Sequence, residues 1–387
     1  MKFTKKRIGI IGTVGVPSRY GGFETLAHQL ILQLRDRFEF TTYCSARNYK
    51  PEERVARWKG SSLVYLPFQA NGVQSIVYDI VSMIHALIFC DVLLVLGVSG
   101  GIFLPVVKLF GRKKVIVNID GLEWRRIKWS GPARRFLRYS EKLAVRYADE
   151  VITDNAAIQQ YVAEFYGRQS RLIEYGADHV DKVLIDPGLV EKYPFLNSRY
   201  AFKVCRIEPE NNIHLVLEAF ARFRYMPLVM VGNWKNSAYG RDLRELYSQY
   251  PFIHMIDPVY DPHELNMLRS NCQVYVHGHS AGGTNPSLVE AMHLGLPVIA
   301  YGAVYNRITT EHACLYFETA DDLLGHLENL PALSLRAQAL RMKEVADRRY
   351  SWQVIANKYR WCLDGRQAEP EPEPEIISEP AALQQAF

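Results

Sequence analysis

The 387-residue sequence predicts an α/β protein of two domains, each a parallel β-sheet flanked by helices. Three observations lead to this fold class. The length favours two domains over one. Hydrophobic residues make up 48% of the chain and charged residues 22%, the balance of a globular protein with a packed core. Short β-branched runs also alternate with segments of helical periodicity, which is typical of parallel sheets.

The first series of elements occupies residues 7–176. Strands are expected at residues 7–13, 39–45, 63–68, 91–97, 114–120, 150–155 and 171–176. Helices are expected at residues 23–34, 75–89, 133–148 and 156–167, where apolar side chains recur with helical spacing. Because helices separate successive strands, this series predicts one open parallel sheet.

A second series follows residues 178–198, which lose periodicity and are rich in Pro, Gly and Asn, as linkers are. Strands and helices then alternate from residue 201 to residue 319. Two such series predict Rossmann-like domains at residues 1–180 and 199–350, facing each other across a cleft. Because ligands of these sheets bind beyond the carboxyl ends of the strands, the cleft is the expected site.

Composition argues against several other classes of protein. The six cysteines lie far apart, which favours reduced thiols in a cytosolic protein over disulfides or structural zinc. The short apolar run near the N-terminus leads into a glycine-rich turn and is not expected to be a signal peptide. Charged residues interrupt the apolar stretch 76–110, so no transmembrane helix is expected there. The Pro- and Glu-rich residues 367–387 are expected to be disordered.

Positive charge concentrates between Arg112 and Arg138. The net charge is only +5, but this stretch holds nine Lys or Arg residues against Asp120 and Glu123. Such a cluster favours an anionic membrane surface or an anionic acceptor. No nucleic-acid partner is expected.

The first candidate motif, GTVGVPSRYGGFET, begins at Gly12 between the first strand and a helix. Gly15, Gly21 and Gly22 allow close backbone approach, and the helix N-terminus offers unpaired N–H groups to an anion. The motif is not the dinucleotide pattern G-x-G-x-x-G. A tight turn without a ligand is an equal alternative, although the length of the loop favours function.

The most informative motif is HGHSAGGTNPSLVEAMHLGLPVIA, from His277 to Ala300. A strand ends, a glycine-rich loop follows, and Asn285 and Pro286 predict the cap and first turn of a helix. Glu290 lies on this apolar helix, where a buried carboxylate needs hydrogen-bond donors. Ribose hydroxyls are suitable donors, and the helix N-terminus would face a diphosphate. Pairing of Glu290 with a structural arginine or a backbone amide is the alternative.

Two further strand ends carry polar candidates. Arg206 follows an expected strand, where its guanidinium suits a diphosphate leaving group, but a surface arginine is the simpler interpretation. Asp120 ends the strand before GLEWRRIKW, and strand-end carboxylates can orient or deprotonate a hydroxyl acceptor. Capping of the next helix is an equal alternative for Asp120.

The sequence contains no recognisable motif for hydrolytic or metal-dependent chemistry. His277, His279 and Ser280 suggest a hydrolase, but no G-x-S-x-G elbow accompanies them. No D-x-D pair stands between apolar strands, and the Asp321-Asp322 pair is typical of a helix start. An arginine and helix dipoles would therefore have to stabilise a leaving diphosphate.

Together, GTVGVPSRYGGFET, NIDGLEWRRIKW, VCRIEPENN and HGHSAGGTNPSLVEAM resemble the retaining GT-B glycosyltransferases of the large bacterial polysaccharide and lipopolysaccharide family. The likeness extends to about residue 361 and is greatest for rhamnosyltransferases of capsule and exopolysaccharide assembly. It implies an acceptor-binding N-terminal domain, a donor-binding C-terminal domain, and a final helix at 351–366 that crosses back to the first domain. It implies a nucleotide-sugar donor, with dTDP-rhamnose favoured, and neither a cofactor nor a metal.

Carried over residue by residue, the resemblance assigns Glu290 to the ribose and Arg206 to the diphosphate, with Asp120 orienting the acceptor. These three are the expected catalytic residues. The expected donor-binding residues are Gly21, Gly22, Arg206, Gly282, Gly283, Thr284, Asn285, Pro286, Ser287 and Glu290. The expected acceptor-binding residues are Tyr20, Asp120, Glu123 and Trp124.

The sequence departs from the broader family at two positions. Gly282 stands where the family has a glutamate eight residues before the ribose-binding one. Asn211 and Asn212 stand where a lysine usually follows the arginine. Both departures fit the rhamnosyl subgroup, whose 6-deoxy donor lacks one hydroxyl. Lys203 or another cation would then join Arg206 and the helix N-terminus in neutralising the leaving group.

The resemblance implies transfer of L-rhamnose from dTDP-rhamnose to a lipid-pyrophosphate-linked saccharide in bacterial surface polysaccharide synthesis. The protein is expected in the cytoplasm, peripherally on the inner face of the cytoplasmic membrane, with Arg112–Arg138 contacting anionic lipid. A hexosyltransferase using a UDP- or GDP-sugar is one alternative. A sugar-nucleotide 2-epimerase of the same fold and a non-catalytic scaffold are two others.

Overall fold

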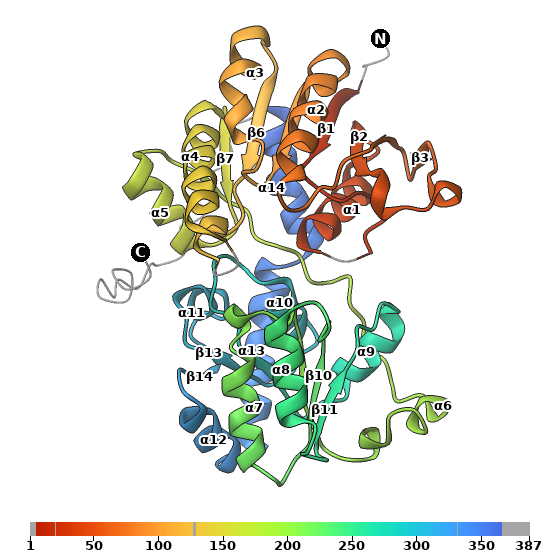
Figure 1. The fold of residues 1–387 in the computed structure, drawn as a ribbon, viewed down its shortest axis with the longest axis vertical. Coiled ribbons are helices and arrows are strands. Elements are labelled where there is room, and N and C mark those ends of the chain that lie inside the picture. The colour runs from red at the N-terminus through yellow and green to blue at the C-terminus, as the bar shows by residue number, and fades with distance from the viewer. Residues whose placement is uncertain (1–4, 20, 127–128, 331, 366–387) are drawn as a thin grey trace. The chain divides into compact units, whose positions relative to one another are not determined.

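The computed structural model describes residues 5–19, 21–126, 129–330 and 332–365 (Figure 1). The chain divides into two compact units. Among the described residues, unit 1 joins those up to Tyr175 with residues 352–365, and unit 2 runs from Gly176 to Ser351. The predicted α/β fold with two parallel sheets is confirmed.

Unit 1 is built on an eight-stranded sheet in the order β3-β4-β2-β1-β5-β6-β7-β8. Its strands are β1 (Lys6–Ile11), β2 (Phe38–Ser45), β3 (Arg57–Trp58), β4 (Ser61–Leu66), β5 (Val92–Leu96), β6 (Lys114–Asn118), β7 (Glu150–Thr153) and β8 (Arg171–Leu172). All neighbours are parallel except β3, which pairs antiparallel with β4. The central strand β5 is buried throughout, as a strand covered on both faces must be. The sequence analysis did not predict β3, because two residues are too few to show strand alternation.

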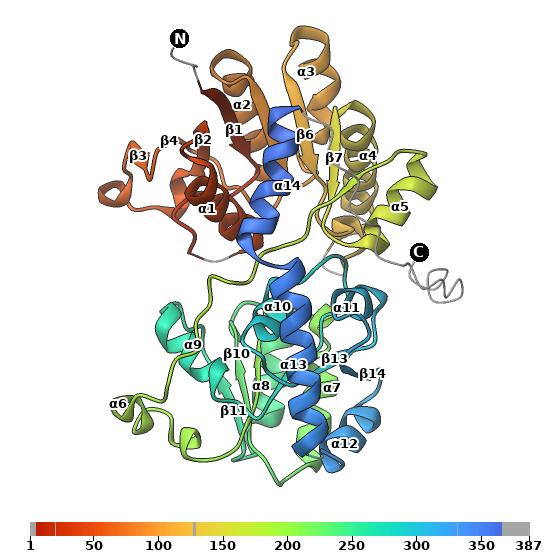
Figure 2. The ribbon, with the colours of Figure 1, turned by 180° about the vertical axis from the view of Figure 1, so that it is seen from behind.

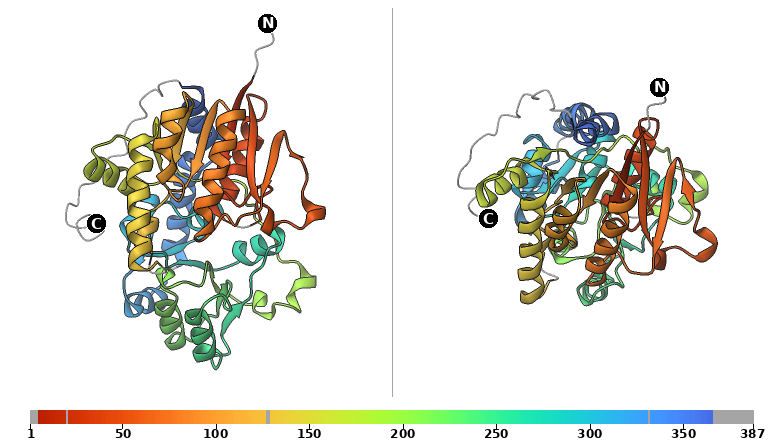
Figure 3. Two further views of the ribbon diagram at one scale, coloured as in Figure 1. Left: turned by 45° about the horizontal axis from the view of Figure 1, so that its top comes forward. Right: turned by 90° about the horizontal axis from the view of Figure 1, so that it is seen from above.

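Helices cover both faces of this sheet. On one face α2 (Gln74–Phe89), α3 (Leu104–Phe110) and α4 (Gly131–Tyr147) lie side by side (Figures 1 and 3). On the other face are α1 (Gly22–Leu34) and α14 (Trp352–Asp364), whose apolar side chains share a core with β1 (Figure 2). Helix α5 (Ala156–Tyr166) follows β7 and packs against α4. The helix expected at residues 351–366 is thus α14, and it lies in unit 1.

Unit 2 is built on a six-stranded parallel sheet in the order β11-β10-β9-β12-β13-β14. Its strands are β9 (Ala201–Val204), β10 (Leu228–Val231), β11 (Ile253–Ile256), β12 (Val274–His277), β13 (Val298–Tyr301) and β14 (Leu315–Phe317). Because the strands are parallel, their carboxyl ends share one edge. The neighbouring strands β9 and β12 thereby bring the segments after Val204 and His277 to the same place.

Helices cover both faces of the second sheet as well. Helices α9 (Pro262–Ser270), α10 (Pro286–His293) and α13 (Ala332–Arg349) supply one apolar cluster, and α7 (Ile213–Arg222), α8 (Ala238–Tyr247) and α12 (Ala320–Glu328) the other. Asp321 and Asp322 lie in the first turn of α12, which confirms the predicted helix start. The remaining helices of this unit are α6 (Pro187–Val190) and α11 (Val304–Thr309).

The stretch expected to be a linker belongs to unit 2. Val180, Tyr193, Phe195 and Leu196 are all buried in one of its apolar clusters. The lack of periodicity in this stretch therefore reflects an irregular segment with one short helix and not a linker. Unit 2 begins at Gly176.

Three general features bear on function. No helix among the described residues is long and apolar enough to cross a membrane. Within the same described ranges, no group of three or more His, Cys, Asp or Glu side chains is placed to hold a metal ion. All six cysteines are free thiols, and five of them are buried. The tail from residue 367, which was expected to be disordered, lies outside the described residues.

Candidate functional site

The loop between β12 and α10 has the local structure that the sequence predicts. The side-chain Oδ1 of Asn285 accepts hydrogen bonds from the backbone N of Ser287, at 3.1 Å, and from its hydroxyl, at 2.8 Å. Pro286 occupies the first turn, and Thr284 is buried. Gly282 and Gly283 have φ angles of 38° and 77°, which favour glycine. The loop is therefore shaped by its own sequence and delivers the N-terminus of α10 to the carboxyl edge of the sheet.

Glu290 is ion-paired within unit 2. Arg269, at the end of α9, donates through Nη1 to Oε2 of Glu290, and His179 Nε2 lies 3.3 Å from Oε1. The side chains of Glu290 and Arg269 are only 14% and 4% exposed. Burial alone would raise the pKa of Glu290, but the charge of Arg269 and the contact with His179 outweigh it and lower the pKa to about 2. Glu290 is therefore a carboxylate at neutral pH.

The pairing with Arg269 is the structural alternative that the sequence left open for Glu290. The Glu290 carboxylate can still accept further hydrogen bonds, because each oxygen has two lone pairs and accepts only one of these contacts. Neither Arg269 nor His179 was predicted as a partner of Glu290. Arg269 carried a weak signal as a charged residue inside an otherwise helical apolar pattern, whereas nothing in the sequence pointed to His179.

Arg206 lies at the carboxyl end of β9, and its side chain is exposed. Within the described part of the chain, its guanidinium forms no ion pair or hydrogen bond. Its backbone carbonyl accepts a hydrogen bond from Asn211 Nδ2 at 2.8 Å, which folds the following turn back. A cation without an internal partner at a strand end is free to meet an anion.

The turn after Arg206 is bound to the loop after β12. Ser280 N donates to the carbonyl of Glu210 at 2.8 Å, and Asn212 Nδ2 donates to the carbonyl of Gly278 at 2.9 Å. His279 Nδ1 and Asn211 Oδ1 lie 3.0 Å apart. The structure thus brings together the two segments that carry the predicted donor residues of unit 2. The side chains of Asn211 and Asn212 contribute to the connection.

Two buried basic side chains lie beneath this pair of loops. Lys203 on β9 is 1% exposed, and His277 ends β12. Burial lowers the pKa of Lys203, and burial together with Lys203 lowers the pKa of His277. Among the described residues, Lys203 Nζ has no ion-pair or hydrogen-bond partner, and neither has His277 Nε2. A Cβ on Gly278 would lie 2.8 Å from Lys203 Nζ, so the missing side chain there leaves room for the ammonium group.

The glycine motif of unit 1 is closed by a side chain that the sequence analysis did not name. Glu24, in the first turn of α1, accepts hydrogen bonds through Oε1 from Val14 N at 2.7 Å and from Thr13 Oγ1 at 3.1 Å. Gly21 has φ of 123°, and a Cβ there would lie 1.9 Å from Glu24 Oε2. Gly22 begins α1. Tyr20, predicted to bind the acceptor, lies outside the described residues.

The segment after β6 holds the other acceptor candidates. Asp120 is half-buried with φ of 59°, and its backbone N donates to Asn118 Oδ1 at 2.9 Å. The following 3-10 turn, Glu123–Arg125, has Leu122 as its N-cap and no side-chain capping bond. Asp120 therefore does not occupy the N-cap position of this turn.

Glu123 and Trp124 have partners inside unit 1. Glu123 accepts from Trp129 Nε1 at 3.0 Å and from Arg126 Nη1 at 3.3 Å. The guanidinium groups of Arg125 and Arg138 both lie over the Trp124 ring, at 5.3 and 5.1 Å from its centroid. These contacts order the basic turn.

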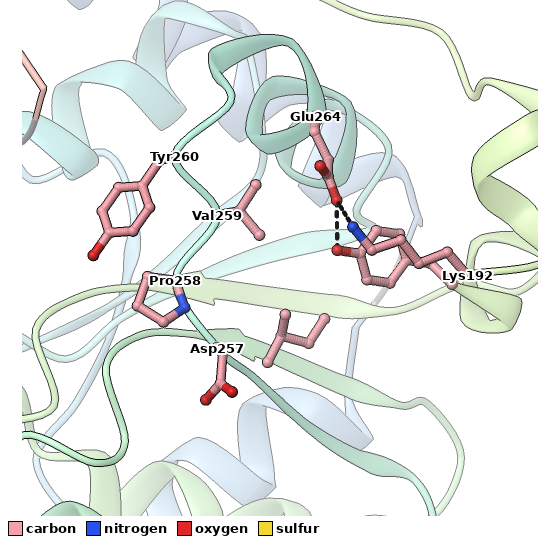
Figure 4. A pocket seen from close by; sticks show the side chains of 8 residues that line it. Lys192, Asp257, Pro258, Val259, Tyr260 and Glu264 are labelled. Atoms are coloured by element: carbon pink, nitrogen blue, oxygen red, sulfur yellow. Dashed lines mark hydrogen bonds and ion pairs between the residues drawn. The ribbon is translucent and has the colours of Figure 1, made fainter.

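A separate pocket of about 440 Å³ lies in unit 2 beyond the end of β11 (Figure 4). Glu264 forms one side, where its carboxylate accepts from Lys192 Nζ at 2.7 Å and from the hydroxyl of Tyr193 at 2.5 Å. Ile256, Asp257, Pro258, Val259 and Tyr260 complete the lining. No residue of the predicted site lines this pocket.

Comparison with protein families gives two matches. Residues 189–310 match the family described as "Glycosyl transferases group 1". Residues 5–178 match a family described as "Domain of unknown function (DUF1972)". No curated protein matches the sequence.

Solved structures match nearly the whole chain. Sucrose-phosphate synthase from Thermosynechococcus elongatus has a TM-score of 0.79 and 16% identity over 93% of this chain and 100% of its own. HepE of Anabaena in complex with UDP has a TM-score of 0.68 and 15% identity over 94% and 100%. Trehalose 6-phosphate synthase from Burkholderia multivorans has a TM-score of 0.70 and 12% identity over 95% and 100%. The chain therefore has the GT-B fold, and its residues 189–310 are similar to the glycosyltransferase group 1 family.

Proposed function

We propose that the protein is a retaining glycosyltransferase whose unit 2 binds a nucleoside diphosphate sugar. The observation that carries this proposal is the unpartnered guanidinium of Arg206 at the start of a turn that is hydrogen-bonded to the loop before α10, with the ionised Glu290 on that helix. An exposed cation and the positive end of the α10 dipole suit a diphosphate, and a carboxylate suits ribose hydroxyls. The group 1 match supports this use of unit 2.

In the proposed reaction the bond between the anomeric carbon and the diphosphate oxygen breaks, and the acceptor oxygen bonds to the same carbon. The acceptor proton passes to the departing diphosphate on the same face, so configuration is retained. Arg206, Lys203 and the N-terminus of α10 stabilise the charge that develops on the leaving group. Asp120 orients the acceptor hydroxyl. Catalysis then rests on positioning and electrostatics.

For the donor we propose dTDP-rhamnose. Gly282 presents only backbone where the family that the chain resembles has a carboxylate for a sugar hydroxyl, and a 6-deoxy sugar has one hydroxyl fewer. HepE has been solved in complex with UDP and with UDP-glucose, which keeps a UDP-hexose as the second candidate.

A thermal-shift screen tests the donor. At one hundred times its Kd a ligand adds about 2.7 kcal/mol to the free energy of unfolding, so dTDP-rhamnose is expected to raise Tm by several degrees, and GDP-sugars less. Transfer to a lipid-pyrophosphate saccharide should follow with the same donor. A Tm shift with UDP-hexoses and none with dTDP-rhamnose would show that the donor is a UDP-hexose. No Tm shift with any nucleotide sugar would reject the proposed glycosyltransferase function.

For the acceptor we propose a lipid-pyrophosphate-linked saccharide at the inner face of the bacterial cytoplasmic membrane, with the stretch Arg112–Arg138 contacting anionic lipid. The guanidinium groups of Arg112, Arg134 and Arg135 form no ion pair or hydrogen bond with any described residue, so their charge is not neutralised within the described part of the protein. Unneutralised cations near a surface of anionic lipid contribute about 1 kcal/mol each.

Charge reversal tests this contact. The triple variant Arg134→Glu, Arg135→Glu, Arg138→Glu is expected to reduce sedimentation with phosphatidylglycerol vesicles at least tenfold, since about 1 kcal/mol is lost per cation. A matched triple reversal of exposed cations in unit 2, at Lys182, Arg224 and Arg241, should leave it unchanged. Equal sedimentation of both variants would show that the basic stretch does not contribute to membrane binding.

A further inference from the structure

The outer surface of α2 carries no charge. Its one charged residue, Asp79, is buried against the sheet, while Val77, Ile84, Ile88 and Phe89 are exposed. A surface helix normally places charged and polar side chains outward. An outward apolar side on a helix therefore indicates that something else covers it.

Helix α3 extends the same surface. Leu109 and Phe110, at its end, are 77% and 79% exposed, and Val106 is exposed one turn before them. Helices α2 and α3 are neighbours in the layer on one face of the unit 1 sheet (Figure 3). Single exposed apolar residues are ordinary, but a continuous group is not. We call Ile84, Ile88, Phe89, Val106, Leu109 and Phe110 the apolar face.

The helix beside the apolar face carries only positive charge outward. Helix α4 packs against α3 and exposes Arg134, Arg135, Arg138 and Lys142. The carboxylates within α2, α3 and α4 are those of Asp79 and Glu141, and both are buried. Arg134, Arg135 and Lys142 have no ion-pair partner among the described residues. The layer therefore joins an apolar surface to an unneutralised cationic one.

A pocket of about 420 Å³ opens on this cationic side. Arg135, Arg138 and Lys142 line it, together with Tyr139 of α4 and the aromatic side chains Tyr161, Phe165 and Tyr166 of α5. The Tyr161 and Tyr166 hydroxyls both donate to Glu141 Oε1, at 2.9 and 2.7 Å, which fixes this wall. Three cations around aromatic rings form a suitable environment for an anionic head group, and Tyr side chains favour the membrane interface.

We propose that the α2–α3–α4 layer is the surface on which unit 1 docks to an anionic phospholipid bilayer. Leu109, Phe110 and the rest of the apolar face enter the boundary between head groups and acyl chains, while the cations of α4 contact lipid phosphates. This inference rests on the membrane contact of the proposed function and adds to it, because it attributes membrane binding to insertion of apolar side chains as well as to charge. A second copy fits less well, since a two-fold contact through this layer would bring the same cations together.

Vesicle flotation tests the insertion. The double variant Leu109→Ser, Phe110→Ser is expected to lower partitioning onto vesicles of phosphatidylglycerol and phosphatidylcholine roughly a hundredfold, since burial of each side chain is worth a factor of about ten. The control variant Tyr225→Ser, Leu246→Ser removes two exposed apolar side chains of unit 2 and should partition as the unmodified chain does. Part of the binding should persist at about 0.5 M salt, where charge attraction is screened but insertion is not.

A fluorescent reporter locates the contact. In a Phe110→Trp variant, the added emission should shift to shorter wavelength on these vesicles and be quenched by brominated acyl chains. Unchanged partitioning of the Leu109→Ser, Phe110→Ser variant, or no quenching at position 110, overturns the proposal. A dimer in solution that this double variant dissociates would assign the apolar face to a second copy and equally overturn it.

The membrane result is separable from the proposed transfer. Transfer to an acceptor with a truncated, water-soluble tail should be the same for the chain with and without Leu109→Ser, Phe110→Ser. If the unmodified chain transfers no sugar from any donor, the proposed function fails while the flotation result stands. If both proteins transfer equally and both float equally, the docking surface fails while the function stands.

Discussion

The variant Glu290→Ala is expected to lose sugar transfer and also about 3–5 kcal/mol of the free energy of unfolding. The second effect follows from Arg269, which is 4% exposed and would be left as an unpaired buried charge. A loss of activity in this variant alone therefore would not identify a donor-binding role. Chemical denaturation at neutral pH measures the stability loss directly.

A double variant separates the two roles of Glu290. Glu290→Met combined with Arg269→Met removes both charges, and replacing a buried ion pair by apolar side chains is often neutral for stability. This protein is expected to unfold near the midpoint of the unmodified chain, to bind dTDP and UDP weakly, and to be inactive. If it folds and binds the nucleotide with unchanged Kd in calorimetry, Glu290 is structural and the ribose assignment is wrong.

The pH dependence gives an independent check on the same pair. The pKa of Glu290 is lowered from 4.5 to about 2 in the folded chain, so the unfolded chain binds more protons between these values. The stability contributed by the pair should be fully present above pH 4.5 and be lost as the pH falls toward 2. The difference in free energy of unfolding between the unmodified chain and Glu290→Ala should therefore be constant from pH 7 to 5 and shrink below that. A constant difference down to pH 3 would contradict the ionised pair.

The fold was predictable from the sequence because its signals are local. Parallel strands such as Val92–Leu96 are continuous apolar runs, and the cap at Asn285 is read from a single residue. The irregular stretch after residue 176 was not predictable as part of unit 2. Its buried side chains, Tyr193 and Phe195 among them, are spaced by no regular period, and only tertiary packing places them.

The site was predictable in its residues but not in their partners. Arg206 and the Asn285–Pro286 helix start follow from strand-to-helix junctions, which the sequence marks clearly. The partners of Glu290 come from residues 111 and 21 positions away, His179 and Arg269, and no local pattern joins them. The same holds for Glu24, whose contact with Val14 depends on how the loop closes. The exposure of one side of α2 could not be predicted from the sequence either, because a helix that is apolar on most sides is ordinarily buried.

Lys203 is expected to lower the stability of the ligand-free protein and to raise its affinity for the donor. Lys203 is 1% exposed as a residue and its ammonium group has no partner in the described part of the chain, so its charge is unfavourable in the protein without ligand. Burial lowers the pKa of Lys203 from 10.5, so this penalty is greatest at low pH and disappears as the pH rises past 10.5. The variant Lys203→Met keeps the stem and removes the charge, and Tm at neutral pH should rise by a few degrees.

The same variant should bind dTDP and UDP roughly ten- to a hundredfold more weakly, the range for one lost hydrogen bond to a charged group. Calorimetry at several pH values gives a readout that a purely structural lysine would not move. In the unmodified chain, affinity for the nucleotide should fall as the pH rises through the lowered pKa of Lys203. In Lys203→Met that fall should be absent, and the exposed control Lys235→Met should retain it. A higher Tm with unchanged affinity and an unchanged pH profile would show that Lys203 is not the cation that replaces the missing lysine, and Arg206 would then act with the α10 N-terminus alone.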